Sequence, residues 1–372
     1  MSRRRLLPVL AAAALAATAA VTAAPAATAE AASSTAAASP AVRLAWTLLP
    51  TGSTEHFRGL AAVSDRVAWV AGYDGTVLRT TDGGEHWASV GPKLSQANAA
   101  LQFRDIEAFS ADDAVVLSIG NGTDSRIYRT SDGGASWTAT FVNHDEAAFY
   151  DCLAFSDPMH GVANSDPVDG RFRIVATDDG GRTWTRVPAA GMPPVQEGEA
   201  AFAASGQCLA AGTGDRFYLG SGGVPGTKAR VFRSDDGGRT WDVASTPIRS
   251  GSSNGVNGIA FSSAKDGIAV GGSFVRSDLN GGASAWTTDG GATWQRPTVP
   301  TGGYRSGVSF APGLAGVAVA VGLTGSDVTT DSGRTWETFD TGSFDTVSCT
   351  SGLVCWASGA EGRVARLTLA AG

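Results

Sequence analysis

Lysine is scarce in this sequence of 372 residues, which contains only Lys93, Lys228 and Lys265. Acidic residues outnumber basic residues by 35 to 28, and the formal net charge is −7. Without an excess of positive charge the chain has no general attraction for a phosphate backbone, so we expect no nucleic-acid partner. Beyond the N-terminal region the sequence also lacks an apolar run of the length that a membrane span requires, so none is predicted.

Histidine is rare too, and the four histidines are scattered without the spacing of metal ligands. The sequence contains no dinucleotide-binding fingerprint, no haem motif and no cluster of metal-binding residues. We therefore expect neither a metal site nor a cofactor.

The N-terminal region has the pattern of an export signal. Arg3, Arg4 and Arg5 precede an apolar run that starts at Leu6, and small residues suited to cleavage follow between positions 27 and 31. Residues 1–32 are predicted to be a signal peptide, residues 33–42 a disordered linker and residues 43–372 a single domain. The expected product is a secreted, extracellular monomer, and both the general and the twin-arginine export routes fit the pattern.

Cysteine is limited to four residues, which would enter an oxidising compartment after export. Cys349 and Cys355 are separated by five residues across an apparent strand turn, so a disulfide is predicted between them. Cys152 and Cys208 fit either a second disulfide or two small buried thiols.

Glycine, by contrast, is abundant, with 49 residues in addition to 10 Trp and 15 Phe. This composition favours many short strands joined by tight turns, and hence an all-β fold. One octapeptide pattern, [ST]-x-D-x-G-x-x-W, recurs six times, at 80–87, 130–137, 177–184, 234–241, 287–294 and 329–336.

Each position of the octapeptide has a physical role in a hairpin turn. The Asp accepts backbone N–H groups within the turn, the Gly tolerates positive φ, and the Trp begins the next strand and buries its ring. We therefore interpret the six aspartates as structural residues: Asp82, Asp132, Asp179, Asp236, Asp289 and Asp331.

The octapeptide matches the Asp-box, or BNR repeat, and the chain resembles Asp-box β-propellers. Successive aspartates are 50, 47, 57, 53 and 42 residues apart, which is the length of a four-stranded blade with its loops. Residues 344–369 hold three further strand-like runs, and residues 45–50 resemble a fourth strand. The prediction is a seven-bladed propeller whose last blade is completed by the N-terminal strand, so that no sheet edge is left open.

On the face opposite the octapeptides, the starts of the first strands predict a charged central mouth. Alignment on the serines that follow these strands places Arg58, Arg104, Tyr150, Glu199 and Val256 at one position, and neighbouring aromatics add Arg305 and Asp345. The next position contributes Asp105, Asp151 and Asn257, and a loop contributes Asp166. These charges either form a ligand site or pair with one another around a wet channel.

Several segments also resemble exported bacterial relatives of the photosystem II stability/assembly factor family, namely FRGL, FRDIEAF, YDCLAFSD, SDPVDGRF, GEAAFAASG, ARVFRSDDGG and GGYRSGVSF. This resemblance implies a seven-bladed Asp-box propeller. In photosynthetic members it also implies a non-catalytic assembly factor with an arginine-rich patch, for which Arg58, Arg104 and Arg305 are the candidates here. Nothing in the sequence points to a photosystem as the partner.

Two functions follow from this interpretation. The first is a binding or assembly module that holds a protein, peptide or carbohydrate ligand through Arg58, Arg104, Tyr150, Asp151, Asp166, Glu199 and Arg305. The second is a carbohydrate-active enzyme, either a glycoside hydrolase or a polysaccharide lyase, because glycoside cleavage uses two carboxyl groups about 5 to 9.5 Å apart. Its candidate catalytic residues are Asp105, Asp151, Asp166, Glu199, Tyr150 and Tyr304.

Overall fold

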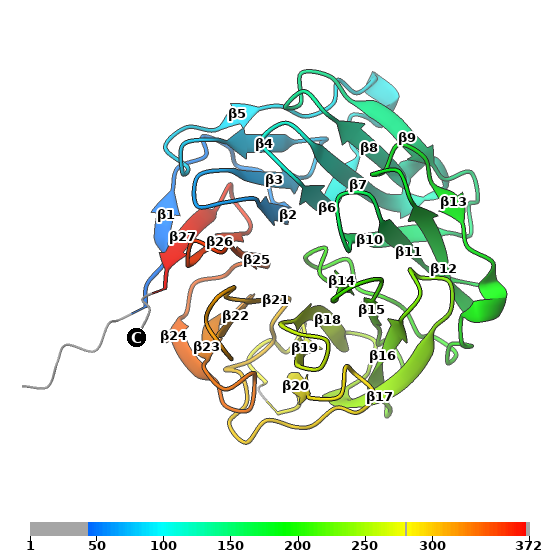
Figure 1. Cartoon of the computed structure of the whole chain (residues 1–372), viewed down its shortest axis with the longest axis vertical. Coiled ribbons are helices and arrows are strands. Elements are labelled where there is room, and N and C mark those ends of the chain that lie inside the picture. The colour runs from blue at the N-terminus through cyan, green and yellow to red at the C-terminus, as the bar shows by residue number, and fades with distance from the viewer. Residues whose placement is uncertain (1–43, 280, 370–372) are drawn as a thin grey trace, which may run out of the picture. The chain divides into compact units, whose positions relative to one another are not determined.

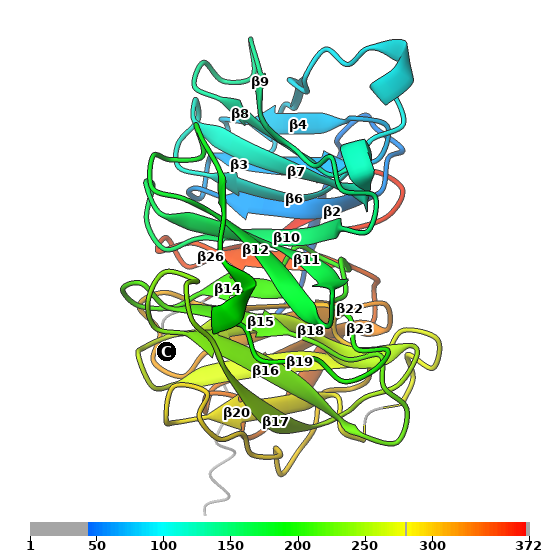
Figure 2. The same ribbon diagram turned by 90° about the vertical axis from the view of Figure 1, so that its right-hand side faces the viewer.

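The computed structural model describes residues 44–279 and 281–369. The predicted signal peptide and linker, residues 1–42, lie outside this part of the chain. The described residues form antiparallel sheets around a common centre (Figure 1). Seen from the side, the strands run across the thickness of the ring and the turns gather on its two faces (Figure 2). The all-β prediction is confirmed.

The first half of the ring contains three successive four-stranded meanders. The first comprises β2 (Phe57–Ala62), β3 (Ala68–Gly72), β4 (Val77–Thr80) and β5 (Ala88–Ser89). The second comprises β6 (Gln102–Ala108), β7 (Ala114–Asn121), β8 (Arg126–Thr130) and β9 (Thr138–Val142). The third comprises β10 (Phe149–Phe155), β11 (Gly161–Val168), β12 (Arg171–Thr177) and β13 (Thr185–Arg186). A short β7–β10 pairing joins the last two into one sheet.

The second half continues with β14 (Leu209–Ala211), β15 (Phe217–Gly220), β16 (Lys228–Ser234) and β17 (Asp242–Arg249). A three-stranded sheet follows, made of β18 (Asn254–Phe261), β19 (Gly267–Ser273) and β20 (Ser284–Thr287). The next sheet is β21 (Gly307–Phe310), β22 (Ala318–Gly322), β23 (Gly325–Thr329) and β24 (Glu337–Asp340). Within the part of the chain that the structure describes, three short 3₁₀ helices lie in loops at Gln96–Asn98, Gly122–Asp124 and Ala189–Gly191.

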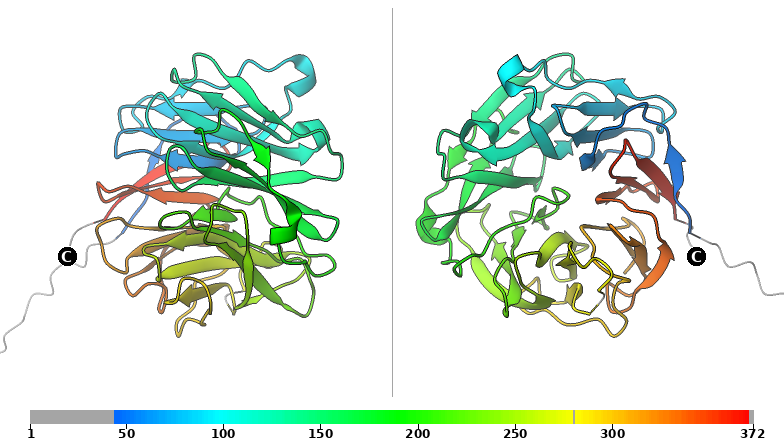
Figure 3. Two further views of the ribbon diagram at one scale, coloured as in Figure 1. Left: turned by 45° about the vertical axis from the view of Figure 1, so that its right-hand side comes forward. Right: turned by 180° about the vertical axis from the view of Figure 1, so that it is seen from behind.

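The last sheet joins the two ends of the described chain. It contains β25 (Thr346–Cys349), β26 (Val354–Ser358), β27 (Val364–Thr368) and the N-terminal β1 (Thr47–Leu49). β1 pairs with β27 so that Leu49 lies opposite Val364, and Figure 3 shows the two strands side by side. The predicted exchange of the N-terminal strand into the last sheet is confirmed, and it removes an open edge.

The hydrophobic core lies between neighbouring sheets. Trp69 packs with Phe103 between the β2–β5 sheet and the β6–β9 strands, and Trp356 packs with Phe57 between the last sheet and the first. The octapeptide tryptophans add to these interfaces: Trp87 meets Trp356 edge to face, and Trp137 meets Trp69 in the same way. Alternation along each strand supplies both faces of a sheet with apolar side chains, so every sheet can pack on two neighbours.

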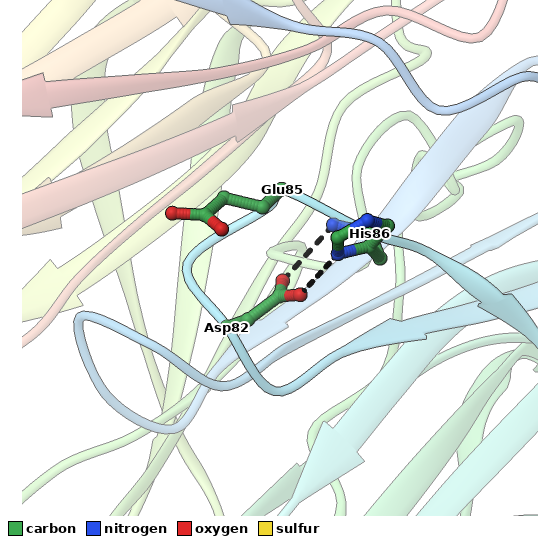
Figure 4. Close-up of side chains that lie close together, drawn as sticks. All are labelled: Asp82, Glu85 and His86. Atoms are coloured by element: carbon green, nitrogen blue, oxygen red, sulfur yellow. Dashed lines mark hydrogen bonds and ion pairs between the residues drawn. The ribbon is translucent and has the colours of Figure 1, made fainter.

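The six octapeptides form turns held by local side-chain bonds. In the first, Asp82 accepts bonds from the backbone N and the Nδ1 of His86 at 3.0 and 2.7 Å (Figure 4). In the other five, the aspartate accepts bonds from the backbone N and the hydroxyl of the Ser or Thr four residues later. The bonds from His86 lower the pKa of Asp82, and those from Ser136 lower the pKa of Asp132. We call this side of the ring the turn face.

Both cysteine pairs are disulfides. Cys349 and Cys355 face each other across the β25–β26 hairpin, as predicted. Cys152 of β10 bonds to Cys208, which precedes β14, so the alternative of two free thiols was wrong. Over residues 44–279 and 281–369, no helix has the length and apolar character needed to cross a bilayer.

Candidate functional site

On the face opposite the turn face, four first strands each carry a β-bulge near their start. The strand register shifts at Arg58 in β2, Arg104 in β6, Asp151 in β10 and Asn257 in β18. A bulge adds one residue to a strand and redirects its side chain. In this protein the redirected side chains are polar, and all four line one pocket.

In two sheets, the serine used for the sequence alignment occupies a hairpin position one residue earlier than in the first two meanders, so the alignment there is shifted by one residue. Ser156 and Ser262 donate their backbone N–H at the hairpin position occupied by Val63 and Phe109 in the first two meanders. Asp151 and Asn257 are therefore the counterparts of Arg58 and Arg104, and Tyr150 and Val256 are not. Tyr150 instead packs in the core, with its ring 5.1 Å from that of Phe141, so its assignment to the site was wrong.

We call each set of successive strands around the ring a strand group. The fourth group, β14–β17, has no bulge of this kind, because its first strand begins only at Leu209. The preceding residues 201–208, here called the crossing segment, leave the sheet and project into the centre of the ring (Figure 1). Glu199 consequently lies away from the mouth. Its carboxylate is buried and paired with Arg230, and it also accepts a bond from Ser221 Oγ at 2.5 Å. Its assignment to the site was therefore wrong as well.

The crossing segment contacts the first strand of every other strand group. Arg58 Nη1 donates to Ala204 O at 3.0 Å and Arg104 Nη1 donates to Ala203 O at 2.8 Å. Further attachments are the Cys152–Cys208 disulfide, Ile259 N to Gln207 O, Thr346 Oγ1 to Ser205 O, and the Gln207 amide to Val308 and Val347. The segment is therefore tied to the first strands all around the ring.

Above the crossing segment lies a pocket of about 430 Å³, here called the mouth. Its polar lining consists of Arg58, Arg104, Asp151, Asp166, Asn257, Tyr304 and Asp345. Its apolar lining consists mainly of Phe149, Phe202, Phe274, Ile119 and Leu323, together with alanines of the crossing segment. All seven of these polar residues were named in the sequence analysis, five of them as site residues: Arg58, Arg104, Asp151, Asp166 and Tyr304.

The two arginines form the cationic part of the mouth. Burial and then the charge of Arg58 lower the pKa of Arg104, so the two guanidinium groups repel each other. Arg104 also donates to Tyr73 Oη and Gln102 Oε1, and its guanidinium lies over the Tyr73 ring. Asp345 balances part of the charge: it lies 3.7 Å from Arg58 and 2.7 Å from His56 Nε2.

The carboxyl groups of Asp151 and Asp166 form a second charged centre. Burial, and then the charge of Asp166, raises the pKa of Asp151 well above its ordinary value. Burial also raises the pKa of Asp166 to about 6. Asp166 accepts a bond from Ala201 N at 2.9 Å, so it holds the start of the crossing segment.

Tyr304 has a less reactive environment than a catalytic nucleophile would need. Its hydroxyl donates to Asn257 Oδ1 at 3.3 Å, and burial raises its pKa, which disfavours the phenolate.

Two other predicted residues lie outside the mouth. Arg305 is fully buried, and its Nε donates to Asp327 at 2.7 Å, so it serves a structural ion pair rather than a ligand. Asp105 is buried and accepts a bond from Leu153 N at 2.7 Å, and a Cβ at Gly206 of the crossing segment would lie 2.4 Å from its Oδ1. The prediction of Arg305 as a ligand-binding residue of the mouth was therefore wrong, and so was the prediction of Asp105 as a candidate catalytic residue there.

The sequence interpretation missed the crossing segment and the apolar rim formed by Phe202, Phe274 and Leu323. Phe274 and Leu323 are 42% and 39% exposed, which is unusual for such side chains beside a pocket. No local pattern in the sequence identifies these residues as the lining of a pocket.

Comparison with known proteins supports the architecture. No family model and no curated protein sequence matches this chain. YCF48 from Cyanidioschyzon merolae is 16% identical with a TM-score of 0.63, covering 87% of this chain and 99% of its own. YCF48 bound to D1 peptide is 14% identical with a TM-score of 0.60, covering 87% and 97%. The Neurospora crassa Pan2 WD40 domain is 13% identical with a TM-score of 0.61, covering 87% and 95%. At these identities the likeness shows the fold, a β-propeller.

Proposed function

We propose that this protein is a binding or assembly module that holds an extended peptide segment of a partner in the mouth. The observation that carries the proposal is the composition of that pocket. Arg58 and Arg104 supply donors beside an apolar rim of Phe202, Phe274 and Leu323. A binding site of this kind offers a peptide both main-chain hydrogen bonds and apolar contacts.

Two further observations support peptide binding. A neighbour of the same fold is described as YCF48 bound to D1 peptide, which shows that a propeller of this shape accommodates a peptide. The mouth also contains donors and acceptors of both signs, which suits a main chain with its alternating N–H and C=O groups.

The sequence predictions on blade number, Asp-boxes, export and domain bounds are also part of this proposal. We infer seven blades, because the described hydrophobic clusters each join two successive strand groups around the ring. We infer that the six octapeptides are Asp-boxes with a structural role. The two disulfides support export to an oxidising compartment, with residues 1–32 as the signal peptide and residues 43–372 as one domain.

Binding to an array of short peptides tests this function, with Phe274→Ala as the test variant. Phe274 is exposed, so its removal leaves the core intact, and we expect binding of the selected peptides to weaken about tenfold. Met159→Ala is the matched control. Met159 is 45% exposed, and it lies on the turn face, where its carbonyl accepts a bond from Gly180 N. Unchanged binding in Phe274→Ala, or no peptide bound by the wild type, would contradict the proposal.

The Asp151–Asp166 pair favours one alternative function, a carbohydrate-active enzyme. A carboxyl group that keeps its proton beside an ionised one is the acid–base combination that glycoside cleavage uses. Sugar release from a panel of polysaccharides tests this function. An enzyme would lose activity about 100-fold or more in Asp151→Asn, and the absence of release by the wild type would exclude this alternative.

A further inference from the structure

Part of the mouth is occupied by the chain itself, through residues 201–204 of the crossing segment. Arg58 and Arg104 each donate one bond to this stretch, at Ala204 O and Ala203 O. Asp166 accepts a bond from Ala201 N. Three charged residues that the sequence predicted as ligand-binding therefore hold a peptide of this protein.

These three bonds go to the main chain of the segment. The side chains at 201, 203 and 204 are methyl groups, so the mouth holds this stretch through its peptide groups rather than through polar side chains. The one large side chain, Phe202, lies 6.2 Å from the ring of the exposed Phe274. Small residues allow the backbone to approach the guanidinium groups closely.

The two ends of the crossing segment are attached differently. The end at Gln207 and Cys208 is fixed by a disulfide to Cys152, three bonds of the Gln207 amide to Val308 and Val347, and one bond to Ile259 N. Residues 202–204, in contrast, are only partly buried. Gln207 lines a second cavity of about 850 Å³ on the turn face, whereas residues 201–204 line the mouth, so the segment contributes to both cavities.

We infer that residues 201–204 are an internal competitor for the mouth. The partner is an extended peptide of small residues whose main-chain carbonyls accept the bonds of Arg58 and Arg104. It binds by replacing residues 201–204, while Gln207 and the disulfide keep the rest of the segment in place. This inference rests on the proposed peptide-binding function and names the class of peptide and the step that limits its entry.

A glycine within the segment offers a way to weaken the competitor. Gly206 has φ of +76°, and a Cβ there would lie 2.4 Å from Asp105 Oδ1, so Gly206→Ala should displace the segment. Gly214→Ala is the matched control, because Gly214 has φ of +67° and a Cβ there would meet nothing within 4 Å. Gln207→Ala is a second way to loosen the segment, since it removes the three amide bonds.

The probe is a synthetic peptide with the sequence of residues 199–206, EAAFAASG. We expect faster amide hydrogen exchange at 201–208 in Gly206→Ala or Gln207→Ala, with exchange in β2 and β6 unchanged. The opened variant should bind the probe about tenfold more tightly than the wild type and Gly214→Ala, because less of its mouth is occupied.

The other outcomes are distinguishable. Equal affinity of the wild type and an opened variant would overturn the competitor and leave the peptide-binding function intact. Unchanged exchange at 201–208 in both variants would show that the segment is a fixed wall, and would overturn the inference in the same way. Absence of peptide binding in every variant, on the array as well as with the probe, would overturn the proposed function itself.

Discussion

The two faces of the ring use aspartate in opposite ways. On the turn face, each octapeptide aspartate bonds to groups two to four residues away, and these bonds lower its pKa. In the mouth, Asp151 is buried and Asp166 beside it is partly buried, and removal from solvent raises the pKa of both. Aspartate therefore stabilises a local turn on one face, whereas on the other face burial disfavours its ionised form, as is common in binding sites.

The largest expected effect comes from the buried ion pair beside the mouth. Arg305→Ala leaves the buried charge of Asp327 without its partner and should lower the free energy of unfolding by about 3–5 kcal/mol. On the turn face, Arg239→Ala removes an exposed pair with Asp178 and should cost less than about 1 kcal/mol. Denaturant unfolding measures the loss of stability in both variants, and losses of equal size would contradict the expected difference between the two faces.

The two disulfides provide the next comparison. Cys152–Cys208 spans a sequence separation of 56 residues, whereas Cys349–Cys355 spans 6. Because a longer closed loop restricts the unfolded chain more, replacing the first pair by alanine should cost about 4 kcal/mol and the second about 2 kcal/mol. Unfolding midpoints of the two double variants test this order, and a larger loss for the short loop would contradict it.

The opposite pKa shifts predict opposite responses to pH. The folded state binds a proton on Asp166 more tightly than the unfolded state does, so this contribution is present at pH 4 and is lost as the pH rises through about 6. Asp166→Asn should therefore raise stability by about 2 kcal/mol at pH 7 and change it little at pH 4. Thermal unfolding at both pH values measures this, and a gain of equal size at both would contradict the assignment.

On the turn face the sign reverses. Burial opposes the change, but bonds from Thr183 and Thr177 lower the pKa of Asp179 to about 2, so its contribution is present above pH 4 and is lost as the pH falls through 2. Asp179→Ala should cost about 1 kcal/mol at pH 7. The neighbouring Asp178 is exposed, so Asp178→Ala is the matched control, and a loss as large as that of Asp179→Ala would sink the structural role.

The sequence alone predicted the all-β propeller, the N-terminal strand in the last sheet and the Cys349–Cys355 disulfide, because each depends on a pattern that repeats or on residues close in the chain. It also named residues that line the mouth. Arg58, Arg104 and Asp151 could be recognised because they are polar residues near the start of a first strand, whereas Asp166 lies near the end of β11 and Tyr304 precedes β21. It failed for Tyr150 because the hairpin serines are not equivalent between sheets. A bulge is defined by pairing with a second strand, so its position does not appear in one strand alone.

Only the tertiary structure decided what the mouth contains. Residues 201–208 form no strand because they bond to other parts of the ring, and those partners are distant in sequence. Glu199 and Arg305 lie outside the mouth for the same reason, since they pair with Arg230 of β16 and Asp327 of β23. Local sequence determines turns and strands through short-range bonds, whereas the occupancy of the channel depends on contacts that exist only once the ring has closed.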